Sequence, residues 1–228
     1  MIDILKLLGA PGSIPFLALS IALGVGLVRF TRRFRRLGVG LLTAVSAGYL
    51  ILALPIVGHA IANSLPAVRT ERPDRIATLI VLDGDNRRGR VRELQRVLAT
   101  DKPVTVWILG DRWILDALEE AGVSGPMFRY DETARKTLAQ MVQVQDIANE
   151  AGGPTAVIAS RLQTPRIVAL IQSRRIPVAV LPSAVDQEPP TNGLRRFVPA
   201  YIALRLSRDA IYEHAALGYY RLRRFVER

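Results

Sequence analysis

Cysteine is absent from the 228-residue chain. Its absence excludes disulfide bonds, thiolate metal sites and cysteine nucleophiles. The absence does not decide the cellular compartment, because a domain with an adequate core needs no disulfide in an oxidising space. The sequence also has no Ser-His-Asp elbow, no Walker lysine motif and no complete Gly-x-Gly-x-x-Gly pattern after a strand. The familiar catalytic signatures are therefore missing.

Acidic and aromatic residues are both scarce. Asp and Glu number 20 against 31 Lys and Arg, which gives a formal net charge of +11, and aromatic residues make up 6% of the chain. The charge divides into +5 in residues 1–65 and +6 in the remainder. In the second part the arginines lack the interleaved aromatic side chains on which single-strand-binding proteins stack bases. We therefore expect no nucleic-acid partner.

Two long uncharged runs dominate the N-terminal part. Residues 7–28 hold no charged side chain, and as a helix they would extend roughly 33 Å, enough for a bilayer core. A second uncharged run covers residues 37–68, with Pro55 as the expected kink. The sequence predicts a two-helix transmembrane anchor in residues 1–68, with the lipid bilayer as partner.

Five arginines lie within residues 29–36, between the two runs. Because cytoplasmic loops carry an excess of Lys and Arg, we expect this loop in the cytoplasm and everything after residue 65 outside it. The expected location is the inner (plasma) membrane, as a multi-pass protein. Three alternatives are a cleaved signal peptide at Ala60-Ile61-Ala62, two buried core helices, and the opposite orientation, which Arg69, Arg72 and Arg75 would favour.

Small residues four positions apart recur in both runs. Such pairs let membrane helices approach closely, although ordinary membrane composition also produces them. The pairs are Ser20 with Gly24, Ala22 with Gly26, and Ala44 with Gly48.

Strand and helix patterns alternate in residues 70–228. Short apolar runs typical of buried strands occupy residues 77–82, 104–109, 155–159 and 178–181, with a shorter one at 126–130. Helical patterns occupy residues 88–98, 113–121, 132–151, 164–173 and 199–228. This alternation predicts an extracytoplasmic α/β domain over residues 70–228 with a doubly wound, mostly parallel Rossmann-like sheet.

Ligands of open parallel sheets bind beyond the carboxyl ends of the strands. That rule selects the turns that follow the predicted strands. The candidate ligand-binding residues are Asp83, Gly84, Asp85, Asn86, Arg88, Gly110, Asp111, Ser160, Gln163 and Arg166.

Two longer motifs carry a resemblance to a known family. The segment Ala159-Ser160-Arg161-Leu162-Gln163-Thr164-Pro165-Arg166 is similar to a strand-end pattern Thr-Ser-x-x-His-x-x-Arg. Residues 206–222 are similar to a closing helix with a glutamate, here Glu213, before a Leu-Gly pair. On these motifs, residues 76–228 resemble the SanA/ElyC/YdcF-like envelope proteins of bacteria. Gln163 stands where that family usually has histidine, and Asp83-Gly84-Asp85 where it has three glycines. The resemblance also adds Glu213 to the candidate ligand-binding residues.

The candidate residues allow more than one chemistry. Ser160 and Arg166 flank an expected helix start and could hold a phosphate or carboxylate. Alternatively, Ser160 caps the helix and Arg166 pairs with Glu213. Asp83 and Asp85 are weak candidates for a catalytic base, and with Asp111 they could hold a cation, but turn formation also accounts for them. We predict no metal site and leave the cofactor open.

The resemblance implies a membrane-anchored factor in envelope biogenesis. Its ligand would be phosphorylated or nucleotide-like and linked to peptidoglycan or lipid-carrier metabolism, and its partners would include envelope-assembly proteins. Two alternatives stay open from the residues: a hydrolase or transferase acting on a phosphorylated glycan precursor, and a non-catalytic interaction domain with a degenerate pocket. Fold alone does not decide among them.

Overall fold

The chain forms two compact units. The computed structural model describes residues 14–30, 34–84, 86–103, 105–120, 122, 127–134, 136–223 and 225–226. One unit combines Met1–Pro66 with Gln187–Ala216, and the other combines Ala67–Asp186 with Leu217–Arg228. Several predictions from the sequence fall wholly or partly on residues outside the described ranges. They concern residues 7–13 of the first uncharged run, residues 31–33 of the arginine-rich loop, Asp85, residues 104 and 126 at the starts of two predicted strands, and residues 121, 135, 224 and 227–228 in predicted helices.

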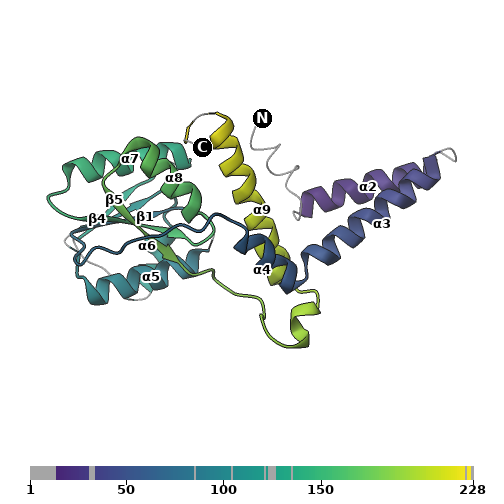
Figure 1. Ribbon diagram of the computed structural model, residues 1–228, viewed down its shortest axis with the longest axis horizontal. Helices are drawn as coiled ribbons and strands as arrows, with labels where there is room; N and C mark the ends of the chain where they lie inside the picture. Colours follow the sequence, from purple (N-terminus) through teal and green to yellow (C-terminus); the bar gives the residue numbers. More distant parts are fainter. Residues whose placement is uncertain are drawn as a thin grey trace. The chain divides into compact units, whose positions relative to one another are not determined.

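The first unit is helical. Its helices are α2 (Ile14–Phe30), α3 (Arg35–Leu52), α4 (Pro55–Asn63), η2 (Leu194–Phe197) and the first part of α9 (Tyr201–Leu222). Helices α2 and α3 lie side by side as a hairpin (Figure 1). A Cβ at Gly38 would lie 2.8 Å from the Gly24 carbonyl oxygen, so the backbones are in close contact there. Of the predicted glycines, Gly24 is at this contact, whereas Gly26 and Gly48 face open space.

Only one described helix, α3, is long and apolar enough to cross a membrane, whereas the sequence predicts two spans. The described part of α2 is a shorter apolar helix. The second uncharged run is also not one kinked helix, because α3 ends at Leu52 and Pro55 begins α4. Proline suits a first helical turn, where it needs no N–H partner, and it holds the preceding Leu54 in an extended conformation. In α3 only Gly38 is buried, unlike in the core helix of a soluble protein.

The second unit has the predicted α/β architecture. Its five strands are all parallel, in the order β3-β2-β1-β4-β5. The strands are β1 (Thr78–Leu82), β2 (Thr105–Leu109), β3 (Phe128–Asp131), β4 (Thr155–Ser160) and β5 (Val178–Ser183), and the helices are α5 (Arg87–Thr100), α6 (Trp113–Glu120), α7 (Thr137–Glu150) and α8 (Thr164–Arg174). The strand order reverses direction between β1 and β4, which makes this the switch point of the sheet.

Both faces of the sheet are covered, so β1 is buried at all five positions. Ile80 and Leu82 of β1 point to the face packed by α7 and α8, and Leu79 and Val81 point to the face packed by α5 and α6. This two-sided burial explains why the strands read as continuous apolar runs rather than alternating ones.

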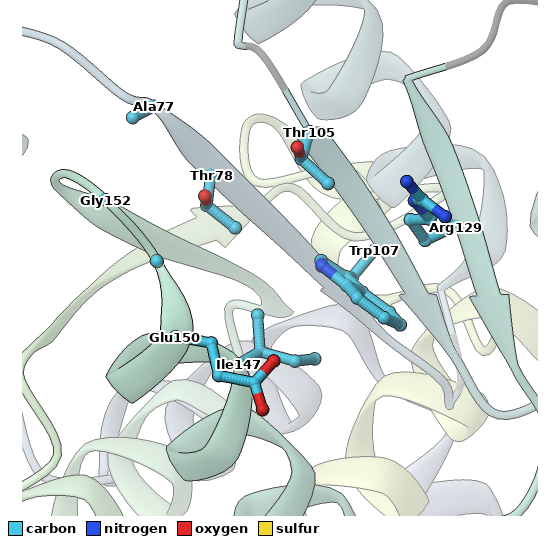
Figure 2. Close-up of a pocket in the computed structure, with 9 residues that line it drawn as sticks. Ala77, Thr78, Thr105, Trp107, Arg129, Ile147, Glu150 and Gly152 are labelled. Atoms are coloured by element: carbon cyan, nitrogen blue, oxygen red, sulfur yellow. The ribbon is translucent and has the colours of Figure 1, made fainter.

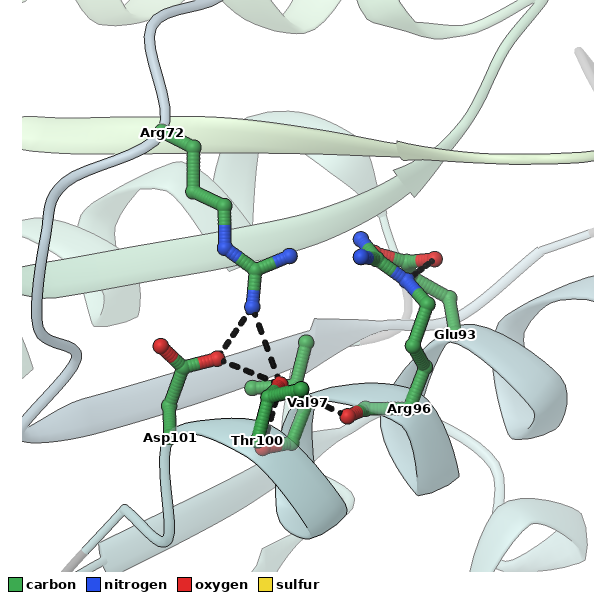
Figure 3. Close-up of polar contacts among 6 residues, drawn as sticks. All are labelled: Arg72, Glu93, Arg96, Val97, Thr100 and Asp101. Carbon is green, nitrogen blue, oxygen red and sulfur yellow. Dashed lines mark hydrogen bonds and ion pairs between the residues drawn. The ribbon is translucent and has the colours of Figure 1, made fainter.

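The segment between the units passes around the β5 edge of the sheet. Val68 packs against the core on the α7 and α8 face. Arg72 forms an ion pair with Asp101 and donates to the Thr100 hydroxyl at the end of α5, on the opposite face (Figure 3). Between them, residues 69–73 form one wall of a groove of about 580 Å³ whose other walls are α8 and β5. The open edge of the sheet is therefore flanked by the protein's own chain.

Candidate functional site

The loops after β1 and β4 meet at the switch point. Gly84 follows β1 with φ at +139°, a conformation that favours glycine. A Cβ there would lie 2.7 Å from Gln163 Nε2 and 2.9 Å from Arg90 Nη2, so both side chains rest directly on the Gly84 backbone. Arg90 Nη2 donates a hydrogen bond to Gln163 Oε1 at 2.7 Å. Two of the predicted residues, Gly84 and Gln163, are thus brought together by an arginine that was not predicted.

Arg90 is the main residue that the sequence prediction missed. It lies in the first turn of α5 and is 0% exposed, whereas the predicted Arg88, two residues earlier, is exposed. Its neighbour Gly89 gives the local reason: a Cβ at Gly89 would lie 1.9 Å from the Ala184 carbonyl oxygen. This turn of α5 is therefore pressed against the loop after β5, which directs Arg90 inward. Fully buried arginines are rare, and they are found where an anion or an acceptor is held.

Asp83 is held in place by its own neighbours. Its Oδ1 accepts hydrogen bonds from Trp113 Nε1 at 2.8 Å and from the Gly84 N–H at 2.6 Å. A Cβ at Gly110, whose φ is +104°, would lie 2.3 Å from the Asp83 Cβ, so the ends of β1 and β2 touch. Two of the predicted residues, Asp83 and Gly110, therefore lie in contact, while Asp111 is exposed. The two hydrogen bonds to Oδ1 therefore link the end of β1 to the start of α6.

The N-terminus of α5 is occupied by a carboxylate of the same unit. Asp186 Oδ1 accepts from the Gly89 N–H at 2.8 Å, and the Asp186 N–H donates to Asn86 Oδ1 at 3.3 Å. In dinucleotide-binding folds, the amides of this first helix are where a pyrophosphate sits. The predicted Asn86 thus accepts a hydrogen bond from the loop after β5. The Asp186 carboxylate lies where the pyrophosphate would sit in a dinucleotide-binding fold.

Two buried serines end the neighbouring strands β4 and β5. Ser160 and Ser183 are register partners, and the Arg161 N–H donates to the Ser183 carbonyl at 2.9 Å. Ser160 Oγ accepts from the Gln163 N–H at 3.4 Å at the start of α8. Ser183 is 1% exposed, and its hydroxyl has no hydrogen-bond partner among the described residues. A buried hydroxyl without a partner costs about 1–3 kcal/mol, so this position indicates a site for another polar group.

Arg166 contributes to a different contact. It is buried, its Nη1 donates to the Thr137 hydroxyl of α7 at 2.8 Å, and its guanidinium carbon lies 5.7 Å from the centre of the Tyr220 ring. The predicted Glu213 is buried and belongs to the first unit. The structure therefore places Arg166 against α7 and Tyr220.

An acid at the end of β3 was also missed. Asp131 Oδ1 accepts from the Thr133 hydroxyl at 2.7 Å and from the Thr133 N–H at 2.8 Å, and Oδ2 accepts from Gln143 Nε2 at 2.6 Å. The hydrogen bonds from Thr133, followed by that from Gln143, lower the pKa of Asp131 below its ordinary value of 3.8. Its place directly after an apolar strand is the same signal that selected Asp83.

One pocket lies at the opposite edge of the sheet, near the starts of the strands. It has a volume of about 400 Å³, with Thr78, Thr105 and Trp107 on its floor and Arg129 and Glu150 at its margins (Figure 2). None of the predicted site residues lines it. The half-buried Trp107, in the middle of a predicted strand, was the available signal, but a strand tryptophan more often belongs to the core.

Among the described residues, no three His, Asp or Glu side chains are grouped so that they could hold a metal ion. No protein-family model, curated protein or solved structure matches the chain. The resemblance to the SanA/ElyC/YdcF-like proteins therefore rests on the sequence motifs alone.

Proposed function

We propose that the chain is a membrane-anchored envelope-biogenesis factor of the SanA/ElyC/YdcF-like type. Its Rossmann-like unit binds the phosphoryl group of a nucleotide-like or lipid-carrier ligand at the switch point of the sheet. The buried Arg90 beside Gly84 and Gln163 is the observation that carries the ligand proposal. The envelope role follows from the motif resemblance.

A buried guanidinium at this place fits an anion for two reasons. It is permanently charged and carries five N–H donors in a planar fork that matches phosphate oxygens. The Ser183 hydroxyl, which has no hydrogen-bond partner in the described part of the chain, adds a hydrogen-bonding group at the same edge of the sheet. With Asp186 already on the amides of α5, we place the phosphoryl group nearer to β4 and β5 than the usual dinucleotide position.

A non-catalytic interaction domain is the second candidate. It is favoured by the close packing at Gly84, where Gln163 and Arg90 fill the space beside the backbone, and by the internal contacts of Asp83. A hydrolase or transferase acting on a phosphorylated glycan precursor would need Asp83 as a base, but Asp83 already accepts from Trp113 and Gly84. The interaction domain therefore ranks above the enzyme.

The proposed topology follows the sequence argument. Helix α3 crosses the inner membrane with α2 packed beside it as a second span. The arginine-rich loop faces the cytoplasm, and the α/β unit lies outside it. Protease added to intact spheroplasts should then remove the α/β unit, whereas protection until lysis would place that unit in the cytoplasm.

The ligand proposal is tested by titrating the full chain in nanodiscs with uridine diphosphate and with a short-chain prenyl phosphate, using calorimetry. We expect at least one of them to bind, and Arg90→Met to abolish the binding. Arg88→Met, an exposed arginine on the same helix, is the matched control and should bind normally. Trp107→Ala, at the opposite edge, should also bind normally. Loss of binding in Trp107→Ala with full binding in Arg90→Met would place the ligand in the other pocket.

A further inference from the structure

Residues 194–201 form an exposed apolar segment in the first unit. They comprise η2 and the stretch that leads into α9. Four large side chains within these eight residues face solvent: Leu194 is 84% exposed, Phe197 49%, Val198 58% and Tyr201 70%. Soluble proteins rarely gather exposed apolar side chains in this way, and such a cluster marks an interaction surface.

Three hydrogen bonds hold this region at the C-terminal end of α3. They join residues more than a hundred positions apart, so they fix a tertiary arrangement rather than a local turn. The bonds run from the Ala200 N–H to the Ala53 carbonyl (2.8 Å), from the Ser207 hydroxyl to the Leu52 carbonyl (2.7 Å), and from His59 Nε2 to the Pro189 carbonyl (3.0 Å). The close fit of Gly58 in α4 against the Ala203 carbonyl of α9, where a Cβ would lie 3.0 Å away, adds to this attachment.

The end of α3 fixes the depth of the segment. Helix α3 begins at Arg35 and Arg36 and continues without another charge to Leu52. Its 18 residues would span roughly 27 Å, close to a bilayer core. If α3 crosses the bilayer, Ala53 lies at the boundary between acyl chains and headgroups. Ala200, bonded directly to Ala53, must then lie at the same depth.

The composition of the segment suits that boundary. Tyrosine and other amphipathic or aromatic side chains favour the headgroup level. Arg195 and Arg196 are exposed beside the apolar side chains, and the Arg196 guanidinium carbon lies 4.7 Å from the centre of the Phe197 ring. Arginine side chains extend from an apolar surface toward water and phosphate, which lets one segment offer both kinds of contact.

We propose that residues 194–201 are an interfacial membrane anchor. The side chains of Leu194, Phe197, Val198 and Tyr201 insert at the level of the headgroups and the first acyl carbons, while Arg195 and Arg196 bind lipid phosphates. The occupant of this surface is the bilayer itself, because the segment is continuous with the end of the span. The inference rests on the proposed membrane crossing of α3, and it adds a third region of contact that lies far from the spans in sequence.

The absence of cysteine allows a direct test with single labelled positions. The full chain carrying Phe197→Cys is labelled with an environment-sensitive fluorophore. It is then reconstituted into vesicles of phosphatidylethanolamine and phosphatidylglycerol that contain nitroxide-labelled lipids. Leu50→Cys, an exposed position of α3, reports on the span. Val142→Cys, an exposed apolar position of α7, is the matched control away from the segment.

We expect shallow nitroxides to quench most of the fluorescence at position 197 and nitroxides on the outer part of the acyl chains to quench position 50, with position 142 unaffected. Quenching at 50 without quenching at 197 would overturn the interfacial anchor and leave the membrane crossing intact. No quenching at 50 would overturn both. A blue-shifted but unquenched label at 197 would indicate a protein partner and overturn the lipid proposal. Equal quenching at 197 and 142 would overturn a specific role for the segment.

Discussion

Arg90 and Gln163, 73 residues apart in sequence, share a hydrogen bond of 2.7 Å between Nη2 and Oε1. The bond joins the first turn of α5, which follows β1, to the N-cap of α8, which follows β4, on the two sides of the switch point. Gln163 also occupies the N-cap position of α8 and makes no side-chain cap there. The Gln163 side-chain amide therefore hydrogen-bonds to Arg90 and does not cap the helix.

Removing that acceptor should destabilise the α/β unit. Gln163→Leu leaves the buried guanidinium without this hydrogen bond, and the loss should be about 1–3 kcal/mol. Gln163→Glu, which keeps an acceptor and adds a charge, should retain most of the stability. Chemical denaturation of the full chain in nanodiscs, followed by tryptophan fluorescence, measures both. Equal stability of Gln163→Leu and the parent chain would show that the bond contributes nothing.

Ser183→Ala separates a binding role from a structural one. The hydroxyl has no partner among the described residues, so its removal should leave stability unchanged or raise it by up to about 1 kcal/mol. If the hydroxyl binds the ligand, the same variant should lose affinity in the calorimetric titration. A variant with raised stability and full affinity would exclude Ser183 from the site.

Gly89 should not tolerate a side chain. The Cβ of Gly89→Ala would lie 1.9 Å from the Ala184 carbonyl oxygen, so α5 would be pushed away from the loop after β5, at about 1–3 kcal/mol or more. Gly152→Ala is the control, because a Cβ there meets nothing within 4 Å. Thermal unfolding of the two variants should differ clearly, and similar melting temperatures would contradict the close contact.

Asp131 should make stability depend on pH in the acid range. Its pKa in the folded state is lowered, so the unfolded chain binds the proton more readily. The stabilisation is therefore complete above the ordinary pKa of 3.8, which holds in the unfolded chain, and is lost as the pH falls through the lower pKa of the folded state. We expect Asp131→Asn to be less stable than the parent chain at pH 7, with a gap that narrows toward pH 3. A gap independent of pH would mean that the charge plays no part.

The α2 and α3 hairpin should depend on Gly38 and not on Gly40. A Cβ at Gly38 would lie 2.7 Å from a Val28 methyl carbon and 2.9 Å from the Val28 nitrogen, whereas Gly40 has open space. Gly38→Leu should therefore separate the helices and destabilise the first unit by about 1–3 kcal/mol, while Gly40→Leu should be tolerated. The separation of the two helices is measured by the yield of crosslinking between engineered cysteines on α2 and α3. Undiminished crosslinking in Gly38→Leu would argue against the close approach.

The sheet could be predicted because its signal is strong and local. Residues 77–82 and 155–159 are apolar at nearly every position, which only a strand buried on both faces requires, and helical patterns separate the strands. Because the strands could be located, the rule that ligands bind beyond their carboxyl ends then selected Asp83, Gly110 and Ser160. Of these, Asp83 and Gly110 touch.

The remaining features depend on distant parts of the chain. Arg90 resembles the exposed arginines around it, and only the packing of Gly89 against Ala184 shows that it points inward. Likewise, no pattern within residues 187–216 indicates that they fold with the N-terminal helices, because the hydrogen bond from Ala200 to Ala53 is purely tertiary. Pro55 did indicate an interruption in the sequence, but a proline gives the same signal whether it kinks one helix or begins a new one.

The passage of residues 68–72 around the outer strand β5 has a consequence for contacts between molecules. An unprotected parallel edge offers free N–H and C=O groups to a strand from a neighbouring molecule. With Arg72 paired to Asp101, residues 69–73 lie along the β5 side of the sheet. A strand from another molecule would have to displace this segment before it could pair with β5.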